Sequence, residues 1–343
     1  MNNLLSYSGI ITKTKALEAK FITYSNYQSV STLESVIDFV SFLKNHAGYK
    51  DVLTGVDETV IHRGQVEGTF INSLYRDFSR LYQFANPEQR NVLDLIFFRF
   101  EVNILKDCLH MVSNQDKDYD LSLFTDFFNK HSKVNIKALA ASRSMEEFIN
   151  HLKGTDYYNV LTGIQKTDIT SFDYEMKLDI HYFMQAWKLK NKTLKGDNLK
   201  AETSSLGLEI DLLNIIWLYR SKKFYNIVTQ DAYAYIIPVT YMLKKEKLIK
   251  LMEAATMDEF HAVLKTTCYE ELIPALTNGT VEILYQQMVT KNYKNNRNKY
   301  PTSMAPISYY LHLKQLEINQ LTTVIECIRY KLDPQDTMKY IIQ

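Results

Sequence analysis

The sequence predicts an all-α protein built from three related helical bundles. Its 343 residues include only 10 glycines and 6 prolines, whereas β-sandwiches and barrels need frequent turns that such residues usually mark. Apolar residues recur at three- and four-residue spacing, which is the pattern of an amphipathic helix. Two short signatures also occur three times, and repeats of this kind indicate a recurring structural unit.

The first signature contains a tyrosine. Residues 49–56 read YKDVLTGV, and residues 157–164 read YYNVLTGI, 108 positions further on. A looser third copy reads FHAVLKTTCY at residues 260–269 and matches FINHLKGTDY at residues 148–157, at an offset of 112. The third copy lacks the Leu-Thr-Gly of the other two, so exact threefold equivalence is not expected.

The second signature begins with a glutamate. It reads EVNIL from Glu101, EIDLL from Glu209 and EINQL from Glu317, with 108 residues between successive copies. Two independent signatures that share nearly one period indicate a threefold repeat. We therefore expect three helical units, at residues 1–115, 116–225 and 226–343.

Helix boundaries follow from prolines and their neighbours. Asn86-Pro87 is typical of an N-cap followed by proline at the first helical position, and it predicts a long helix to Met111. Asp333-Pro334 predicts the end of the last long helix, because the residue before a proline resists the α conformation. That helix carries the apolar stripe Ile318, Leu321, Ile325, Ile328 and Leu332.

Two polar, basic stretches interrupt the apolar pattern. They are residues 188–200 and residues 291–299, the second of which reads KNYKNNRNK. Runs of this composition are usually solvated, although they can also contact lipid headgroups or an acidic partner. We expect both to be exposed, mobile loops.

The repeated glutamates fall on the apolar side of their helices. At about 100° per residue, Glu101, Glu209 and Glu317 each project among apolar side chains, and Arg220 lies on the line of Glu209 three turns further on. A buried carboxylate needs a partner or a shifted pKa. Each glutamate is therefore either a satisfied internal anchor or part of a shared, polar central cavity that receives a partner. The candidate socket or anchor residues are Glu101, Glu209, Arg220, Glu317 and Arg329.

Composition and motifs exclude several classes of protein. The formal net charge of +1 argues against a dedicated nucleic-acid binder. No P-loop, dinucleotide-binding, HExxH or GxSxG motif occurs, so we expect no catalytic, cofactor-binding or metal-binding residues. The three cysteines are scattered, which indicates no disulfide framework. The chain shows neither a signal peptide nor an apolar run long enough to span a bilayer.

Two segments carry a resemblance to a known family. Residues 311–330 read LHLKQLEINQLTTVIECIRY, and residues 15–23 read KALEAKFIT. The first resembles the closing signature of the V-type ATPase C-subunit family, whose eukaryotic counterpart is the d subunit, and the second resembles its opening helix. The resemblance extends over the whole chain, and its prokaryotic members belong to A/V-type ATP synthases.

The resemblance implies a fold and a role. The fold is a funnel of three pseudo-repeated helical bundles around a pseudo-threefold axis. The implied role is that of a non-catalytic central-stalk component on the cytoplasmic face of the membrane. Its cavity would hold the central shaft, made of the D and F subunits, and its other end would meet the proteolipid ring. It would transmit torque for ion transport without binding nucleotide.

A different class of protein also fits the residues. A free α-helical scaffold could bind a protein or peptide in a central groove and have no rotary role. Co-purification distinguishes the two, because only the rotary component would bring head and ring subunits with it. A helical metal-dependent enzyme is a third class, and the spacing of the eight histidines gives it little support.

Overall fold

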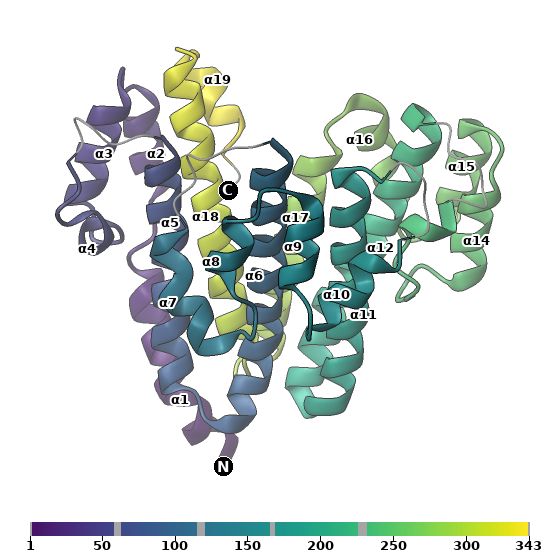
Figure 1. The fold of residues 1–343 in the computed structure, drawn as a ribbon, viewed down its shortest axis with the longest axis horizontal. Helices are drawn as coiled ribbons and strands as arrows, with labels where there is room; N and C mark the ends of the chain where they lie inside the picture. The colour runs from purple at the N-terminus through teal and green to yellow at the C-terminus, as the bar shows by residue number, and fades with distance from the viewer. Residues whose placement is uncertain (1, 58–62, 115–120, 165–168, 226–231, 342–343) are drawn as a thin grey trace.

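The computed structural model describes residues 2–57, 63–114, 121–164, 169–225 and 232–341. Every regular element in these ranges is a helix, and none is a strand. The predicted all-α fold class is therefore confirmed (Figure 1).

Three pairs of consecutive long helices, here called hairpins, form the body of the molecule. Each is preceded in the chain by a set of short helices, so the order of elements repeats three times. The hairpins are α5 (Arg63–Phe84) with α6 (Pro87–Asn114), α11 (Ser171–Thr193) with α12 (Gly196–Tyr225), and α17 (Val281–Lys299) with α18 (Ala305–Arg329).

The short helices form three groups, one before each hairpin in the chain. The first group is α2 (Tyr24–Ser31), α3 (Val36–Asn45) and α4 (Lys50–Leu53). The second is α7 (Ser122–His131), α8 (Ile136–Ala140), α9 (Met145–His151) and α10 (Asp156–Thr162). The third is η1 (Tyr233–Tyr235), α14 (Lys245–Glu253), α15 (Met257–Leu264) and α16 (Leu272–Asn278). Helices α1 (Asn2–Glu18) and α19 (Pro334–Lys339) lie outside this pattern.

Local sequence explains the sharp turn between α5 and α6. The Asn86 side chain accepts the Gln89 N–H at 2.9 Å, and the Gln89 side chain accepts the Asn86 N–H at 3.0 Å. This reciprocal cap satisfies two N–H groups that have no partner within the helix. The predicted start of a long helix at Pro87 is confirmed, and the helix runs to Asn114, slightly beyond Met111.

The prediction that the two basic stretches are exposed loops is wrong. Residues 188–193 continue α11, residues 196–200 open α12, and residues 291–299 lie within α17. Lys190 is buried, with its ammonium 3.6 Å from the centre of the Trp187 ring and hydrogen-bonded to Thr203. Asn296 is also buried and donates to the carbonyl of Ala201. Polar residues enter these helices because neighbouring helices supply their partners.

The predicted end of the last long helix is also wrong in position. Helix α18 ends at Arg329, and Asp333-Pro334 instead starts α19, with the Asp333 carboxylate accepting the Gln335 N–H at 2.7 Å. Proline fits the first turn of a helix because that turn needs no N–H donor. Leu332 therefore lies beyond the apolar stripe and is exposed.

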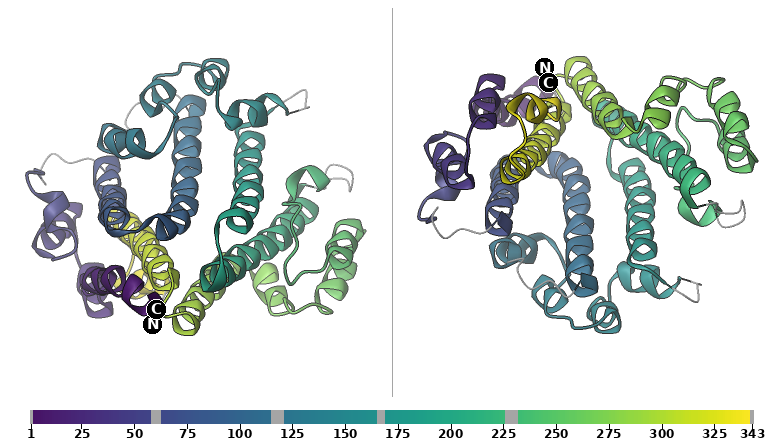
Figure 2. Two further views of the ribbon diagram at one scale, coloured as in Figure 1. Left: turned by 90° about the horizontal axis from the view of Figure 1, so that it is seen from below. Right: turned by 90° about the horizontal axis from the view of Figure 1, so that it is seen from above.

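The long helices pack across the predicted units. Helix α6 packs against α11, α12 against α17, and α18 against α5. Helix α18 also contacts α1, α2 and α3, so the last long helix lies among the first helices of the chain. Figure 2 shows three groups of helices that extend in different directions from the middle of the molecule. The division at residues 115 and 225 stays a prediction.

Apolar side chains hold these groups together in two clusters. The larger joins residues of α1 to α11 with the last long helix, and the smaller joins the second half of α12 with α14 to α17. Within the described ranges, no helix combines the length and hydropathy that a membrane span requires.

A substitution at Gly207 tests the close packing of α12. A Cβ at this position would lie 2.7 Å from Cδ2 of the Tyr241 ring. Gly207→Ala should therefore destabilise the protein by about 2 kcal/mol, because overpacking forces side chains or backbone to shift. Urea unfolding measures the change. Gly9→Ala is the matched control in α1, where the nearest atom is 4.0 Å away; it should be neutral or stabilising. Equal effects of the two substitutions would contradict the packing described.

Candidate functional site

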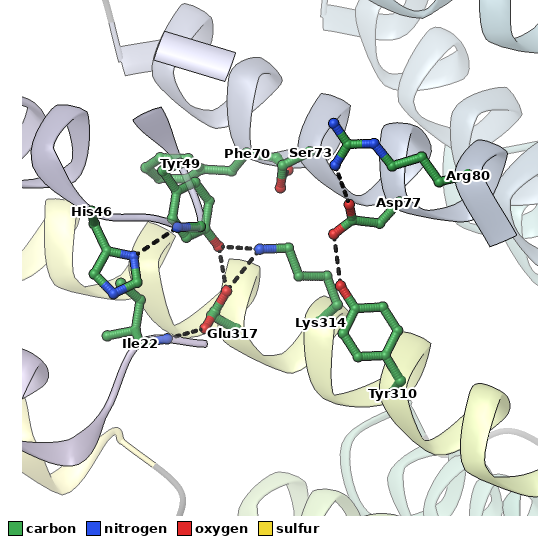
Figure 3. Close-up of polar contacts among 11 residues, drawn as sticks. Ile22, His46, Tyr49, Phe70, Ser73, Asp77, Arg80, Tyr310, Lys314 and Glu317 are labelled. Carbon is green, nitrogen blue, oxygen red and sulfur yellow. Dashed lines mark hydrogen bonds and ion pairs between the residues drawn. The ribbon is translucent and has the colours of Figure 1, made fainter. Parts of the chain in front are cut away.

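Glu317 forms the centre of a buried polar joint between the two ends of the fold. Its Oε1 accepts the Tyr49 hydroxyl at 2.6 Å and the Lys314 ammonium at 2.8 Å. Its Oε2 accepts the Ile22 backbone N–H at 2.6 Å. Figure 3 shows the side chain of Glu317 on α18 facing Ile22 and Tyr49, which belong to two segments of the N-terminal part. We call this set of contacts the closure joint.

Burial makes the closure joint energetically demanding. Glu317 is 5% exposed and Lys314 is 3% exposed, so neither charge is solvated by bulk water. A buried ion pair is tolerated when geometry is good and further hydrogen bonds satisfy both groups. The Lys314 ammonium also donates to the Tyr49 hydroxyl at 2.9 Å and lies 4.0 Å from the centre of its ring. Burial, reinforced by Glu317, raises the pKa of Tyr49, so the hydroxyl keeps its proton and donates it.

A second link lies about one turn before Lys314 on α18. The Tyr310 hydroxyl donates to the Asp77 carboxylate of α5 at 2.6 Å, and Asp77 also pairs with Arg80 at 3.3 Å (Figure 3). Together with the closure joint, it fixes α18 to both the short N-terminal helices and α5.

Glu101 makes an equivalent joint in another part of the molecule. The Tyr157 hydroxyl, from the start of α10, donates to Oε2 of Glu101 on α6 at 2.5 Å, and the Ser132 hydroxyl donates to Oε1. Burial, reinforced by Glu101, raises the pKa of Tyr157, so this hydroxyl is also a donor. The two repeated signatures therefore meet: the tyrosine of one copy binds the glutamate of another.

The joint on α12 uses a different carboxylate. Tyr269 donates to Asp211 at 2.8 Å, and Asp211 also accepts three backbone N–H groups, from Tyr241, Met242 and Leu243. Residues two positions apart on a helix point about 200° apart, so Glu209 faces the other side of α12. It accepts the Arg99 guanidinium of α6 at 2.5 Å and the Tyr293 hydroxyl of α17 at 3.3 Å.

The three joints form a cyclic series. Tyr157 binds the glutamate of α6, Tyr269 binds the carboxylate of α12, and Tyr49 binds the glutamate of α18. The first two connect a long helix to short helices that follow it in the chain. The third connects the last long helix back to the first short helices. The same interaction therefore closes the fold on itself.

Arg99 and Glu209 belong to a polar cluster between α6, α11, α12, α17 and α18. The Arg99 guanidinium donates to the Tyr182 hydroxyl at 3.1 Å, and it lies 5.1 Å from the centre of that ring. Burial, the largest single effect, would lower the pKa of Arg99, but Glu209, Tyr182 and Tyr293 together outweigh it and raise that pKa. A cavity of about 90 Å³ adjoins Arg99.

A buried and a half-buried titratable group line the same cavity, Glu202 and His312 respectively. Glu202 accepts the Ser308 hydroxyl at 2.8 Å, and burial raises the pKa of Glu202 to about 7. His312 pairs with the Thr290 hydroxyl at 2.8 Å, and burial lowers its pKa to about 4. Both groups favour their neutral forms inside the fold, which is the usual effect of desolvation.

Comparison with known proteins assigns the family. The model of the ATP synthase (C/AC39) subunit family matches residues 10–340. The chain belongs to this family. The resemblance noted in the sequence is therefore confirmed over almost the whole chain.

Three relatives illustrate the family. The C subunit of the A-type ATP synthase of Pyrococcus abyssi is 22% identical over 340 residues, which cover 96% of this chain and 88% of the relative. The same subunit of a Desulfurococcus species is 24% identical over 342 residues, with the same coverage. The corresponding protein of Methanosarcina barkeri is 24% identical over 334 residues, covering 94% and 89% of the two chains. Each match extends over most of both chains.

The two candidate arginines, Arg220 and Arg329, take no part in the three joints. Arg220 is exposed and pairs with Glu282 of α17, and Arg329 is exposed and pairs with Glu326 at 3.0 Å. Exposed ion pairs contribute little to stability. In the part of the chain that the structure describes, no three histidine, cysteine, aspartate or glutamate side chains gather as metal ligands.

Four residues of these contacts were not predicted from the sequence: Lys314, Asp211, Arg99 and Glu202. Lys314 could have been found, because it lies one turn before Glu317 and therefore on the same helix face. Asp211 is part of the repeated signature itself. Arg99 and Glu202 carry no comparable signal, since their partners lie on other helices.

Tyr49→Phe tests the closure joint. The substitution removes one hydroxyl and leaves Glu317 and Lys314 each short of a hydrogen bond. We expect a loss of about 2 kcal/mol in the free energy of unfolding, because an unsatisfied buried group carries a desolvation penalty. Urea unfolding measures it, with Tyr24→Phe at an exposed position as the matched control. A loss no larger than that of the control would contradict the role given to the hydroxyl.

Glu202→Gln tests the buried carboxyl. Because the folded pKa of Glu202 lies near 7, above its ordinary value of 4.5, its contribution to stability is fully present below pH 4.5 and is lost as the pH rises through 7. The glutamine variant should match the wild type at about pH 4.5 and exceed it at about pH 8.5 by on the order of 3 kcal/mol. Urea unfolding at both pH values measures this difference. A difference that does not change with pH would contradict the buried, protonated state.

Proposed function

We propose that this chain is the non-catalytic coupling component in the central stalk of a rotary A/V-type ATP synthase. It joins a shaft made of the D and F subunits to the proteolipid rotor ring and transmits torque between ATP chemistry and ion transport. It lies on the cytoplasmic face of the membrane, peripheral to the bilayer. The observation that carries the proposal is the family match over residues 10–340.

The relatives support this role through their names and through the length over which they align with this chain. Each is the C subunit of an A-type ATP synthase, and each aligns over at least 88% of its own length. The likeness therefore extends over most of the length of each relative. It brings no catalytic activity to this chain.

The packing supports a mechanical role. A part that transmits torque must resist deformation, and close-packed protein interiors have low compressibility. Here the last long helix is fixed to the first helices by the closure joint and by Tyr310 with Asp77. A load on one group of helices therefore passes to the others through buried contacts.

We infer that the repeated glutamates act inside the chain and do not contact the shaft. Glu317, Glu101 and Glu209 each already accept hydrogen bonds from two or more groups of this chain. These internal donors already orient each carboxylate and stabilise its charge, so a further partner from the shaft is not needed to satisfy it. The surfaces that meet the shaft and the ring are therefore formed by other side chains.

Co-purification from the source cells tests the proposed function. The chain carries an affinity tag at its chromosomal locus, and membranes are solubilised in a mild detergent. We expect the tagged chain to bring the nucleotide-binding head subunits, the shaft and the ring proteolipid in fixed ratios, with ATP hydrolysis in the eluate.

An untagged strain is the control for non-specific binding. A tagged chain that elutes as a soluble monomer, or with unrelated proteins, would contradict the rotary role. That result would instead support a free helical scaffold with a groove for a peptide or protein.

A further inference from the structure

An open groove lies between α2, α17 and α18. Its volume is about 540 Å³. The segment before α2 completes one wall with Phe21 and Ile22, and Ile341 lies at its edge.

The groove and the polar cluster lie on different faces of α18. The groove is lined by Tyr309, Leu313 and Leu316 of this helix, whereas the cavity beside Arg99 is lined by Ser308 and His312. The groove is thus separate from the contacts between α6, α11 and α12. Its wall includes Glu317 and Ile22, so an occupant would lie directly beside the closure joint.

The groove has a basic side and an aromatic side. Lys291 and Lys294 of α17 form one rim, and Tyr24 of α2 forms the other. The buried Tyr27 also lines the groove on the α2 side. The floor between them is apolar and includes Leu313 and Leu316 of α18. A groove with this asymmetry accepts an amphipathic occupant in one orientation, with acidic groups toward α17 and apolar groups toward α18.

Two exposed cations of the groove have no acidic partner in the described residues, and one buried hydroxyl has no hydrogen bond. Within the ranges that the structure describes, the ammonium groups of Lys291 and Lys294 form no ion pair or hydrogen bond. The Tyr27 hydroxyl is buried and has no hydrogen-bond partner in those ranges. Burial, reinforced by Glu317, raises the pKa of Tyr27, so the hydroxyl stays a donor. The two exposed cations favour an occupant that carries negative charge.

The dimensions suit a helix. The lining residues of α18 run from Tyr309 to Gln320, and at 1.5 Å per residue this is about 17 Å, or three helical turns. We propose that this groove docks an acidic amphipathic helix of a partner subunit. The proposal rests on the proposed function, since the partner belongs to the same rotary assembly.

Site-specific photo-crosslinking in the assembled complex tests the docking proposal. The photoreactive amino acid p-benzoylphenylalanine replaces Tyr24 at the groove in the tagged full-length chain, and in a parallel strain it replaces Tyr233, which is similarly exposed on η1. After irradiation, mass spectrometry identifies the cross-linked peptide. We expect position 24 to cross-link one acid-rich helical segment of a co-purifying subunit, and position 233 not to cross-link that segment.

Charge reversal then tests the basic rim. Lys291→Glu with Lys294→Glu should lower the cross-link yield from position 24 at least tenfold. The matched control, Lys244→Glu with Lys245→Glu, reverses two exposed lysines at the start of α14 and should leave the yield unchanged. Thermal unfolding of both double variants confirms that they fold.

The outcomes separate this proposal from the proposed function. A chain that co-purifies with the head and ring but gives no cross-link at position 24, or cross-links lipid or a basic segment, overturns the docking proposal and leaves the rotary role intact. Equal yields in the two double variants overturn it as well. A chain that does not co-purify with the assembly overturns both.

Discussion

The requirement to pair a buried carboxylate determines how this fold closes. Glu317 lies at 5% exposure on the last long helix, where an unpaired charge would cost several kcal/mol. Its partners Tyr49, Lys314 and Ile22 come from both ends of the fold, so the carboxylate is satisfied only when α18 lies among the N-terminal helices. In this position, α18 forms one wall of the groove beside α17, and its Tyr310 reaches Asp77.

The same requirement recurs on the other two long hairpins, with different partners. Glu101 meets Tyr157 as Glu317 meets Tyr49, but on α12 the tyrosine binds Asp211, which leaves Glu209 to pair with Arg99. Helix α12 thus buries Glu209 and Asp211 on opposite faces, in addition to Glu202. This departure from threefold equivalence links α12 to α6 as well as to its own short helices, and it places a charged pair between the groups of helices.

Much of the fold could be predicted from local sequence. The cap at Asn86 and the apolar arcs around the repeated glutamates depend on neighbours within a few residues. The partners of those glutamates could not be predicted in the same way, because Glu317 and Tyr49 are 268 residues apart. The prediction that the basic stretches are exposed loops was wrong for a related reason. Asn296 and Lys190 have the composition of solvated residues, but other helices supply their hydrogen bonds. The predicted helix end at Asp333-Pro334 was wrong because the same pair can end one helix or begin the next.

Hydrogen exchange of a single amide tests the central claim, that the closure joint is part of the cooperative core. The Ile22 N–H donates to Glu317, so it exchanges only when the joint opens. Native-state exchange monitored by NMR compares its opening free energy with that of the Leu321 amide in the middle of α18. We expect equal opening free energies for the two amides. Rapid exchange at Ile22, several kcal/mol below Leu321, would show that the ends separate while the rest of the fold stays intact, and it would contradict the account.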